Sequence, residues 1–127
     1  MFKSSRIKYG VVTGIVALVI VLPVLLVVNY YNTPGQYDSF AQCLEDKGAM
    51  FYGAFWCSHC QNQKLAFGKS VKLVPYTECS TPDSKGQLQV CKDKKIEGYP
   101  TWEFADGSRL SGEVSIQQLA EKTKCTI

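Results

Sequence analysis

The chain has 127 residues, of which 14 are basic and 11 acidic, for a formal net charge of +3. The excess positive charge lies within the first ten residues, and the remainder carries basic and acidic side chains in equal number. That balance excludes the strongly basic surface typical of nucleic-acid binding proteins, and the length allows one small domain.

Residues 11–28 carry no charge and are mostly Val, Leu and Ile. As a helix they would span about 27 Å, close to the thickness of a bilayer core. Tyr30 and Tyr31 follow, and aromatic residues are enriched where a helix leaves the membrane. We therefore predict a transmembrane anchor over residues 11–31. A cleaved signal peptide is the alternative, although its apolar part is usually about 7–15 residues long and ends in small residues.

Basic residues set the expected orientation of this anchor. Lys3, Arg6 and Lys8 precede it, and the next basic residue is Lys47. Because positive flanks stay in the cytoplasm, residues 1–10 are predicted to be a cytoplasmic tail, with the rest in the periplasm or another extracytoplasmic or lumenal space. The six cysteines agree with an oxidising compartment there.

After a short linker over residues 32–36, residues 37–127 are expected to form one domain. Its elements are predicted from apolar spacing, turn residues and the Asp106-Gly107 hairpin signal. In chain order these are a helix over residues 37–47, a strand over 49–56, a helix over 57–71, a strand over 73–77, a helix over 88–95, strands over 101–105 and 109–112, and a helix over 115–124. This order predicts an α/β fold, with a mixed sheet of about four strands flanked by helices.

The segment Phe55-Trp56-Cys57-Ser58-His59-Cys60 places two cysteines at the start of the second expected helix of this domain. A helix N-terminus favours an anion, and therefore the thiolate that attacks disulfides. A zinc site needs about four ligands, but the chain has one histidine and no second CxxC. A haem attachment site needs histidine directly after the second cysteine, where Gln61 stands. The motif therefore predicts a redox-active dithiol.

A second motif, Gly98-Tyr99-Pro100-Thr101, lies just before the third expected strand. Most X-Pro bonds in folded proteins are trans, and only about 5–6% are cis. An ordinary trans turn is one interpretation of this motif. The alternative is a cis-proline loop that faces the CxxC motif and offers backbone groups to a peptide.

The blocks FYGAFWCSHCQNQKLAFG, YTEC and IEGYPTWEF resemble the thioredoxin-like domain that follows bacterial and plant homologues of vitamin K epoxide reductase. The resemblance covers roughly residues 40–120. It implies a thioredoxin-like fold, a cis peptide at Pro100, and functional roles for Cys57 and Cys60. The quinone-reducing helices of that family are missing from the chain, so the resemblance implies a separate membrane partner. Typical thioredoxins also carry a buried Asp on the strand before CxxC, whereas residues 51–55 include no carboxylate.

Within this resemblance Cys57 is the expected nucleophile and Cys60 the cysteine that resolves a mixed disulfide. A protonated His59 would stabilise the Cys57 thiolate and make the dithiol more oxidising, unless His59 is only a solvated surface residue. Substrate contacts are expected from Trp56, Ser58, Tyr99 and Thr101. Trp56 and Trp102 have core packing as their alternative.

The other four cysteines are expected to form structural disulfides. Cys79 and Cys91 flank a polar loop, and the resembling family has a comparable pair. Cys43 and Cys125, in the first and last helices of the domain, then remain. Three pairings of the four are possible and the sequence does not select one. A redox relay through Cys79 and Cys91 is the alternative to a structural role.

Together these features predict a membrane-anchored thiol–disulfide oxidoreductase that uses the Cys57–Cys60 disulfide and binds no cofactor or metal. It is expected to oxidise protein thiols and to be re-oxidised by a quinone-linked membrane partner resembling vitamin K epoxide reductase. One alternative is a disulfide reductase, for example in cytochrome c maturation. The other is a disulfide-stapled binding module without turnover.

Overall fold

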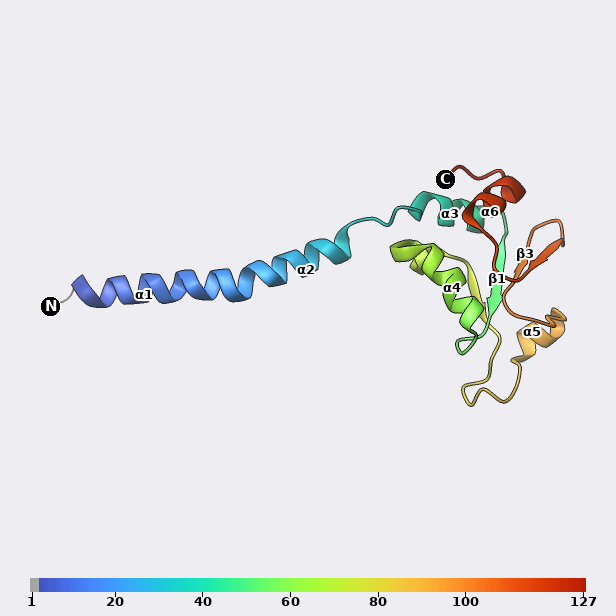
Figure 1. Cartoon of the computed structure of the whole chain (residues 1–127), viewed down its shortest axis with the longest axis horizontal. Helices are drawn as coiled ribbons and strands as arrows, with labels where there is room; N and C mark the ends of the chain where they lie inside the picture. Colours follow the sequence, from blue (N-terminus) through green and yellow to red (C-terminus); the bar gives the residue numbers. More distant parts are fainter. Residues whose placement is uncertain (1–2) are drawn as a thin grey trace. The chain divides into compact units, whose positions relative to one another are not determined.

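The computed structural model describes residues 3–127, with side chains from Tyr9 onward. The chain divides into two compact units, one that ends at Thr33 and one that spans Pro34–Ile127 (Figure 1). The described part leaves out the first two residues of the predicted cytoplasmic tail. It also leaves out the side chains of the three basic residues in that tail.

The first unit is a continuous helical segment. It consists of α1 (Lys3–Val16), a π-helical stretch η1 (Ala17–Val21) and α2 (Leu22–Asn32). Pro23 lacks a backbone N–H and crowds the carbonyl four residues earlier, which falls within η1, so the local π-helical winding has a steric cause. The stretch Tyr9–Asn32 is long and apolar enough to cross a membrane, and none of it is buried. An N-terminal signal sequence can also satisfy this criterion of length and composition, so the helix is either an anchor or a signal sequence.

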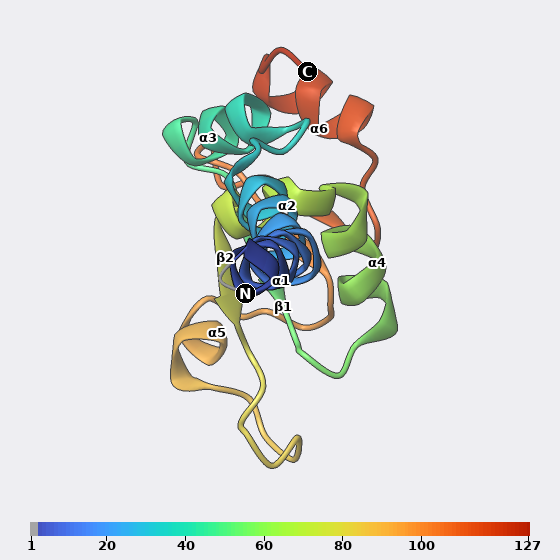
Figure 2. The ribbon, with the colours of Figure 1, turned by 90° about the vertical axis from the view of Figure 1, so that its left-hand side faces the viewer.

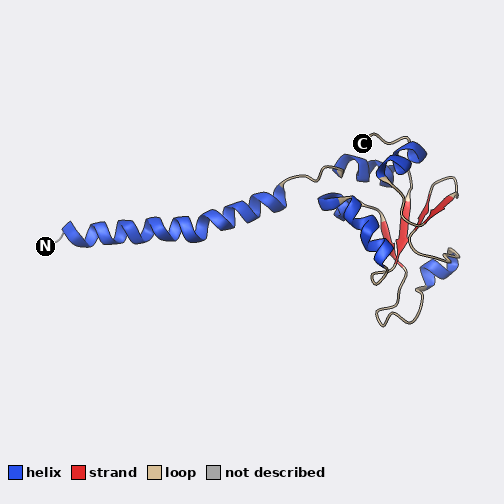
Figure 3. Ribbon diagram, viewed as in Figure 1, coloured by secondary structure: helices blue, strands red, loops and turns tan. Residues whose placement is uncertain are grey.

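The second unit contains a four-stranded mixed sheet, as the element order predicts (Figure 3). The strands are β1 (Met50–Gly53), β2 (Tyr76–Glu78), β3 (Thr101–Glu103) and β4 (Arg109–Ser111), in the spatial order β2-β1-β3-β4. β1 and β2 are parallel, whereas β1–β3 and β3–β4 are antiparallel. A parallel pair needs a crossover, and the helical segment between β1 and β2 supplies it.

Helices cover this sheet. They are α3 (Asp38–Asp46), α4 (Ser58–Ala66), the 3-10 helix η2 (Gly68–Leu73), α5 (Gln89–Asp93) and α6 (Ile116–Thr123). The predicted element order is confirmed, but most elements are shorter than expected, including the strand expected over 101–105, which ends at Glu103, and the helix expected over 88–95, which spans Gln89–Asp93. The strand expected over 49–56 ends at Gly53, the helix expected over 57–71 is broken at Gly68, and the strand expected over 73–77 begins only after Pro75. Gly68 has a φ of 54°, which ends an α-helix.

Aromatic side chains fill the centre of the domain. Trp102 stacks on Phe51 with ring centroids 5.2 Å apart, and Phe67 packs against both Trp102 and Phe40. All four side chains are almost fully buried. Two disulfides connect elements that surround this core. Cys43–Cys125 joins α3 to the segment after α6, which lies beside it in Figures 1 and 2, and Cys79–Cys91 joins the end of β2 to α5.

Candidate active site

The CxxC motif lies where β1 gives way to α4. A turn closed by the Cys57 N–H on the Ala54 carbonyl, at 3.0 Å, reverses the chain and leaves Cys57 as the N-cap of α4. Cys57 and Cys60 are free cysteines in this structure, in contrast to the other four; Cys57 is half-exposed and Cys60 is fully buried. Burial raises the pKa of the Cys60 thiol to about 12, and a hydrogen bond with Cys57 adds to the effect. The motif thus has one accessible sulfur and one protected sulfur.

The loop before β3 faces the accessible sulfur. β3 is the antiparallel neighbour of β1, with Thr101 opposite Tyr52, so the start of β3 lies beside the end of β1. The Tyr99–Pro100 peptide is cis, as the resemblance implied. The Cys57 thiol donates to the Tyr99 carbonyl at 3.7 Å. The alternative of an ordinary trans turn is therefore wrong.

The two tryptophans have different environments. Trp56 is exposed, donates its indole N–H to the Ser80 hydroxyl at 2.8 Å, and meets the Tyr99 ring edge-on at 6.1 Å. Trp102 is fully buried in the core. Core packing is thus the environment of Trp102, whereas Trp56 forms part of the surface beside Cys57.

Two further residues expected to contact substrate lie beside the motif in different settings. Ser58 is exposed in the first turn of α4. Thr101 is buried, and its hydroxyl donates to the Gly98 carbonyl at 2.8 Å. Thr101 therefore holds the cis-proline loop in place, and its hydroxyl is already engaged within the domain.

His59 has a partner that the sequence did not indicate. Its side chain is 68% exposed, and Nδ1 lies 2.7 Å from Oε1 of Glu113, which also accepts from the Asn62 amide at 3.0 Å. The hydrogen bond with His59, followed by that from Asn62, lowers the pKa of Glu113. His59 is therefore not merely solvated, and it faces a carboxylate from the loop before α6.

Gln63 fixes that loop. Its buried amide donates to the Val114 carbonyl at 2.9 Å and accepts from the Val114 N–H at 2.7 Å. The Gln63 amide thus satisfies both backbone groups of Val114, as a neighbouring strand would. It holds the adjacent Glu113 against α4. The roles of Gln63 and Glu113 were missed from the sequence because their partners, Val114 and His59, lie 51 and 54 residues away along the chain.

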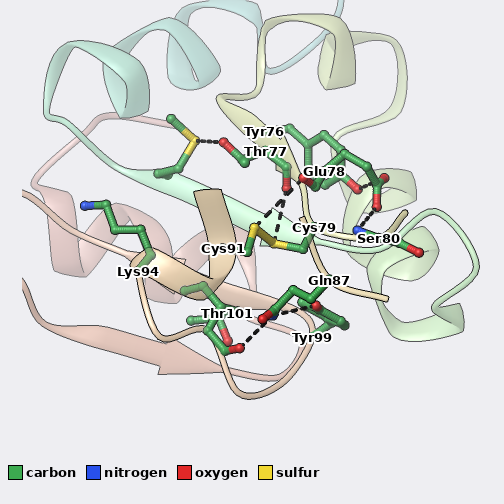
Figure 4. The surroundings of a disulfide bond; sticks show 12 residues. Tyr76, Thr77, Glu78, Cys79, Ser80, Gln87, Cys91, Lys94, Tyr99 and Thr101 are labelled. Atoms are coloured by element: carbon green, nitrogen blue, oxygen red, sulfur yellow. Dashed lines mark hydrogen bonds between the residues drawn. A yellow bond between two sulfur atoms is a disulfide. The ribbon is translucent and has the colours of Figure 1, made fainter. Parts of the chain in front are cut away.

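The Cys79–Cys91 disulfide closes a loop whose residues contact Trp56 and Tyr99 beside Cys57 (Figure 4). Cys79 continues β2, and its N–H donates to the Gly53 carbonyl at 2.8 Å. The loop that the disulfide closes carries Ser80 and Gln87; Ser80 accepts from Trp56, and Gln87 donates to the Tyr99 hydroxyl at 2.8 Å. The disulfide thus anchors the loop that positions both aromatic residues beside Cys57.

No protein-family model matches the chain. It is 48% identical over 90 residues to thiol-disulfide oxidoreductase LTO1 of Arabidopsis thaliana, a match that covers 67% of this chain and 23% of that protein. It is 32% identical over 97 residues to the thioredoxin domain-containing protein 5 homolog of Drosophila melanogaster, covering 66% of this chain and 22% of that protein. The chain thus spans less than a quarter of either relative. With its fold and CxxC motif, it contains a thioredoxin-like domain homologous to part of the plant thiol–disulfide oxidoreductase.

Proposed function

We propose that the chain is a thiol–disulfide oxidoreductase in which Cys57 and Cys60 exchange a disulfide with protein thiols. The observation that carries this proposal is the pairing of an accessible thiol at a helix N-terminus with a buried thiol in the next turn. A nucleophile has to reach its substrate, whereas a resolving thiol has to be shielded from it. The similarity to a plant protein named as a thiol–disulfide oxidoreductase supports the same chemistry.

The reaction moves two electrons through sulfur. A substrate thiolate attacks Cys57 of the oxidised pair, the Cys57–Cys60 bond breaks, and Cys60 leaves as a thiolate that takes up a proton. A second substrate thiolate then attacks the mixed disulfide, so that a substrate disulfide forms and Cys57 leaves as a thiolate. The substrate is oxidised and the pair is reduced. The same steps in reverse would reduce a substrate disulfide.

We propose that the preferred direction of the exchange is oxidation of substrate thiols. A positive charge on His59, two residues after Cys57, would favour a thiolate at Cys57, and a stabilised reduced form makes a dithiol more oxidising. Glu113 offsets part of that positive charge because it lies 2.7 Å from the imidazole. Re-oxidation is assigned to a quinone-linked membrane partner resembling vitamin K epoxide reductase, the partner that the sequence resemblance implies.

The surface beside Cys57 suits a peptide substrate. Phe55 and Trp56 are exposed aromatic side chains, and Ser58 is exposed next to them. Tyr99 presents its backbone at the cis peptide. An extended peptide would bind backbone to backbone at Tyr99 and pack an apolar side chain on Trp56.

The location proposed for this chemistry is an extracytoplasmic or lumenal space. In this proposal residues 1–10 are a cytoplasmic tail, residues 11–31 the anchor, residues 32–36 a linker and residues 37–127 the thioredoxin-like domain. The apolar helix Tyr9–Asn32 supports an anchor, and the two disulfides suit an oxidising compartment.

The test is substrate trapping with the full-length chain. Cys60→Ser keeps the nucleophile but lacks the resolving thiol, so mixed disulfides through Cys57 should accumulate. Cys57→Ser is the matched control and should trap at least about tenfold less. Non-reducing electrophoresis followed by mass spectrometry measures both. Equal trapping by the two variants, or none by either, would contradict the proposal.

A further inference from the structure

The first residues of the thioredoxin-like domain are fixed to η2, the segment that follows α4. A Cβ at Gly35 would lie 2.7 Å from the backbone nitrogen of Ser70, so a side chain at this position would displace η2. Two residues later, the N–H of Tyr37 donates to the hydroxyl of Ser70 at 2.9 Å, and Ser70 is fully buried. Tyr37 also meets Phe67 edge-on, with ring centroids 6.4 Å apart. The chain is therefore held to η2 from Gly35 onward.

The stretch of chain between the apolar helix and this contact is short. α2 ends at Asn32, so only Thr33 and Pro34 precede Gly35. Three residue steps span at most about 11 Å, and Pro34 restricts both its own backbone and that of Thr33. With Tyr9–Asn32 as the anchor that the proposed function assigns, the part of the domain next to Gly35 cannot move far from the membrane surface.

This part of the domain exposes apolar and basic side chains beside a groove. The groove has a volume of about 540 Å³ and is lined by residues 34–37 and 65–69. Within it, Leu65 is 75% exposed and Lys69 is exposed beside it. Lys72 is one turn of the 3-10 helix after Lys69, so both lysines lie on the same side of η2. Leu65, Lys69, Lys72 and the groove are called the tether face below.

The tether face carries a net positive charge. Residues 61–77 include three lysines and no acidic residue, and both Lys69 and Lys72 are exposed. The acidic neighbour is Asp38, which is half-buried, and its Oδ2 accepts from the N–H of Gly35 at 2.9 Å. One carboxylate, turned to the backbone, therefore faces two exposed ammonium groups.

We propose that the tether face binds the surface of the membrane that holds the anchor, with Lys69 and Lys72 at anionic headgroups and Leu65 in the interfacial layer. This inference rests on the anchor of the proposed function. Lysines are attracted to an anionic lipid surface, and an exposed apolar side chain gains free energy by leaving water. Each contribution alone is weak. Because the short tether keeps the face at a high effective concentration next to the lipid, the contact needs little intrinsic affinity.

Such a contact orients the active site. Cys57 caps the N-terminus of α4, whereas the tether face lies at the C-terminal end of the same helix (Figure 1). A helix of nine residues is about 13 Å long, so the accessible sulfur and the lipid contact are at opposite ends of it. The sulfur is thereby kept clear of the lipid, where a redox partner in the same membrane and substrates in the adjoining space can both reach it.

A fluorophore at position 65 tests the contact. Leu65→Cys is made in the full-length Cys57→Ser/Cys60→Ser chain, which leaves one free thiol for nitrobenzoxadiazole, a label whose emission rises as it leaves water. The chain is reconstituted in vesicles of phosphatidylcholine, with or without about one third phosphatidylglycerol. Emission should be at least about twofold stronger in the anionic vesicles and should fall when concentrated salt screens the charges. Val90→Cys on α5, at another exposed apolar position, is the labelled control and should not respond.

Charge variants separate the lysines of the tether face from the overall charge of the chain. Lys69→Gln/Lys72→Gln should remove at least about half of the increase at position 65, whereas Lys85→Gln/Lys92→Gln, which removes the same charge elsewhere, should not. An equal response at positions 65 and 90, or a response that neither anionic lipid nor Lys69→Gln/Lys72→Gln changes, would overturn the proposal. A response that follows the density of protein in the vesicles would indicate contact with a second copy and would also overturn it. Release of the chain by alkaline carbonate would contradict the anchor and this inference together, whereas substrate trapping tests the exchange reaction separately.

Discussion

At the scale of single residues, Glu103 is held by two cations from different parts of the chain. Lys94 donates to it at 2.8 Å from the end of α5, and Arg109 donates Nε at 2.9 Å from β4. Arg109 also donates to the carbonyls of Lys94 and Lys95, so the group ties the α5 turn to the β3–β4 hairpin. The hydrogen bond from Lys94, with a contribution from Arg109, lowers the pKa of Glu103, whose side chain is 15% exposed.

Glu103→Gln should destabilise the domain in a pH-dependent way. The folded pKa of Glu103 lies below its unfolded value, so its stabilising contribution is complete above the unfolded pKa of about 4.3 and is lost as the pH falls through the folded pKa. We expect a loss of about 1 kcal/mol at neutral pH, which shrinks as the pH falls below the unfolded pKa and through the folded pKa of Glu103. Urea unfolding at neutral pH and at an acidic pH measures it, with Glu121→Gln as the control. An equal loss at both pH values would contradict the ionic origin.

The sequence predicted the residues of the CxxC motif and of the cis-proline loop because each is a short contiguous pattern. It did not predict the charged partners of the site. Glu113 lies 54 residues from His59, and Glu78 lies 23 residues from Phe55. Such contacts depend on strand register and on loop paths, which a local pattern does not specify.

At the scale of elements, the order of the α-helices and strands in the domain followed from apolar spacing and turn residues, whereas their lengths and the separate 3-10 helix η2 did not. The aromatic run that suggested a strand to residue 56 continues into a turn, where Phe55 and Trp56 are exposed beside the active cysteine. An apolar pattern cannot distinguish side chains buried in a core from those exposed at a binding surface. The break at Gly68 does have a sequence signal, because glycine commonly ends a helix.

The two disulfides connect different elements and should contribute unequally to stability. Cys79–Cys91 spans 12 residues between β2 and α5, whereas Cys43–Cys125 spans 82 residues and joins α3 to the C-terminal segment. Loop-closure entropy predicts about 3 kcal/mol for the shorter and about 4.5 kcal/mol for the longer. The double variants Cys79→Ser/Cys91→Ser and Cys43→Ser/Cys125→Ser should therefore both melt at lower temperature, the second by more.

Thermal unfolding of the two double variants, each the other's control, measures this difference. The opposite order would contradict the entropic account. Wild-type melting of Cys79→Ser/Cys91→Ser together with lost turnover with its redox partner would identify a relay in place of a structural disulfide.

At the scale of the whole molecule, strand order explains how distant motifs form one site. The parallel β1–β2 crossover directs α4 from the end of β1, and the antiparallel β1–β3 pairing brings the start of β3 to the same end. Cys57 and Tyr99 therefore meet although 42 residues separate them. The element order predicted a mixed sheet and the resemblance implied a thioredoxin-like fold, whereas the strand order β2-β1-β3-β4 comes from the structure. The apolar N-terminal helix is a separate unit, and its role as an anchor remains a prediction.

The central claim is that Cys57 and Cys60 form an oxidising redox couple, and its reduction potential tests this most directly. The full-length chain is equilibrated in a series of glutathione buffers and quenched, and each cysteine is then quantified by alkylation and mass spectrometry. We predict that Cys57 and Cys60 titrate together as one two-electron couple, at a potential more oxidising than the roughly −270 mV of thioredoxin, while Cys43–Cys125 and Cys79–Cys91 stay oxidised. A Cys57–Cys60 pair that stays in one state throughout, or that titrates at or below the thioredoxin value, would contradict the claim.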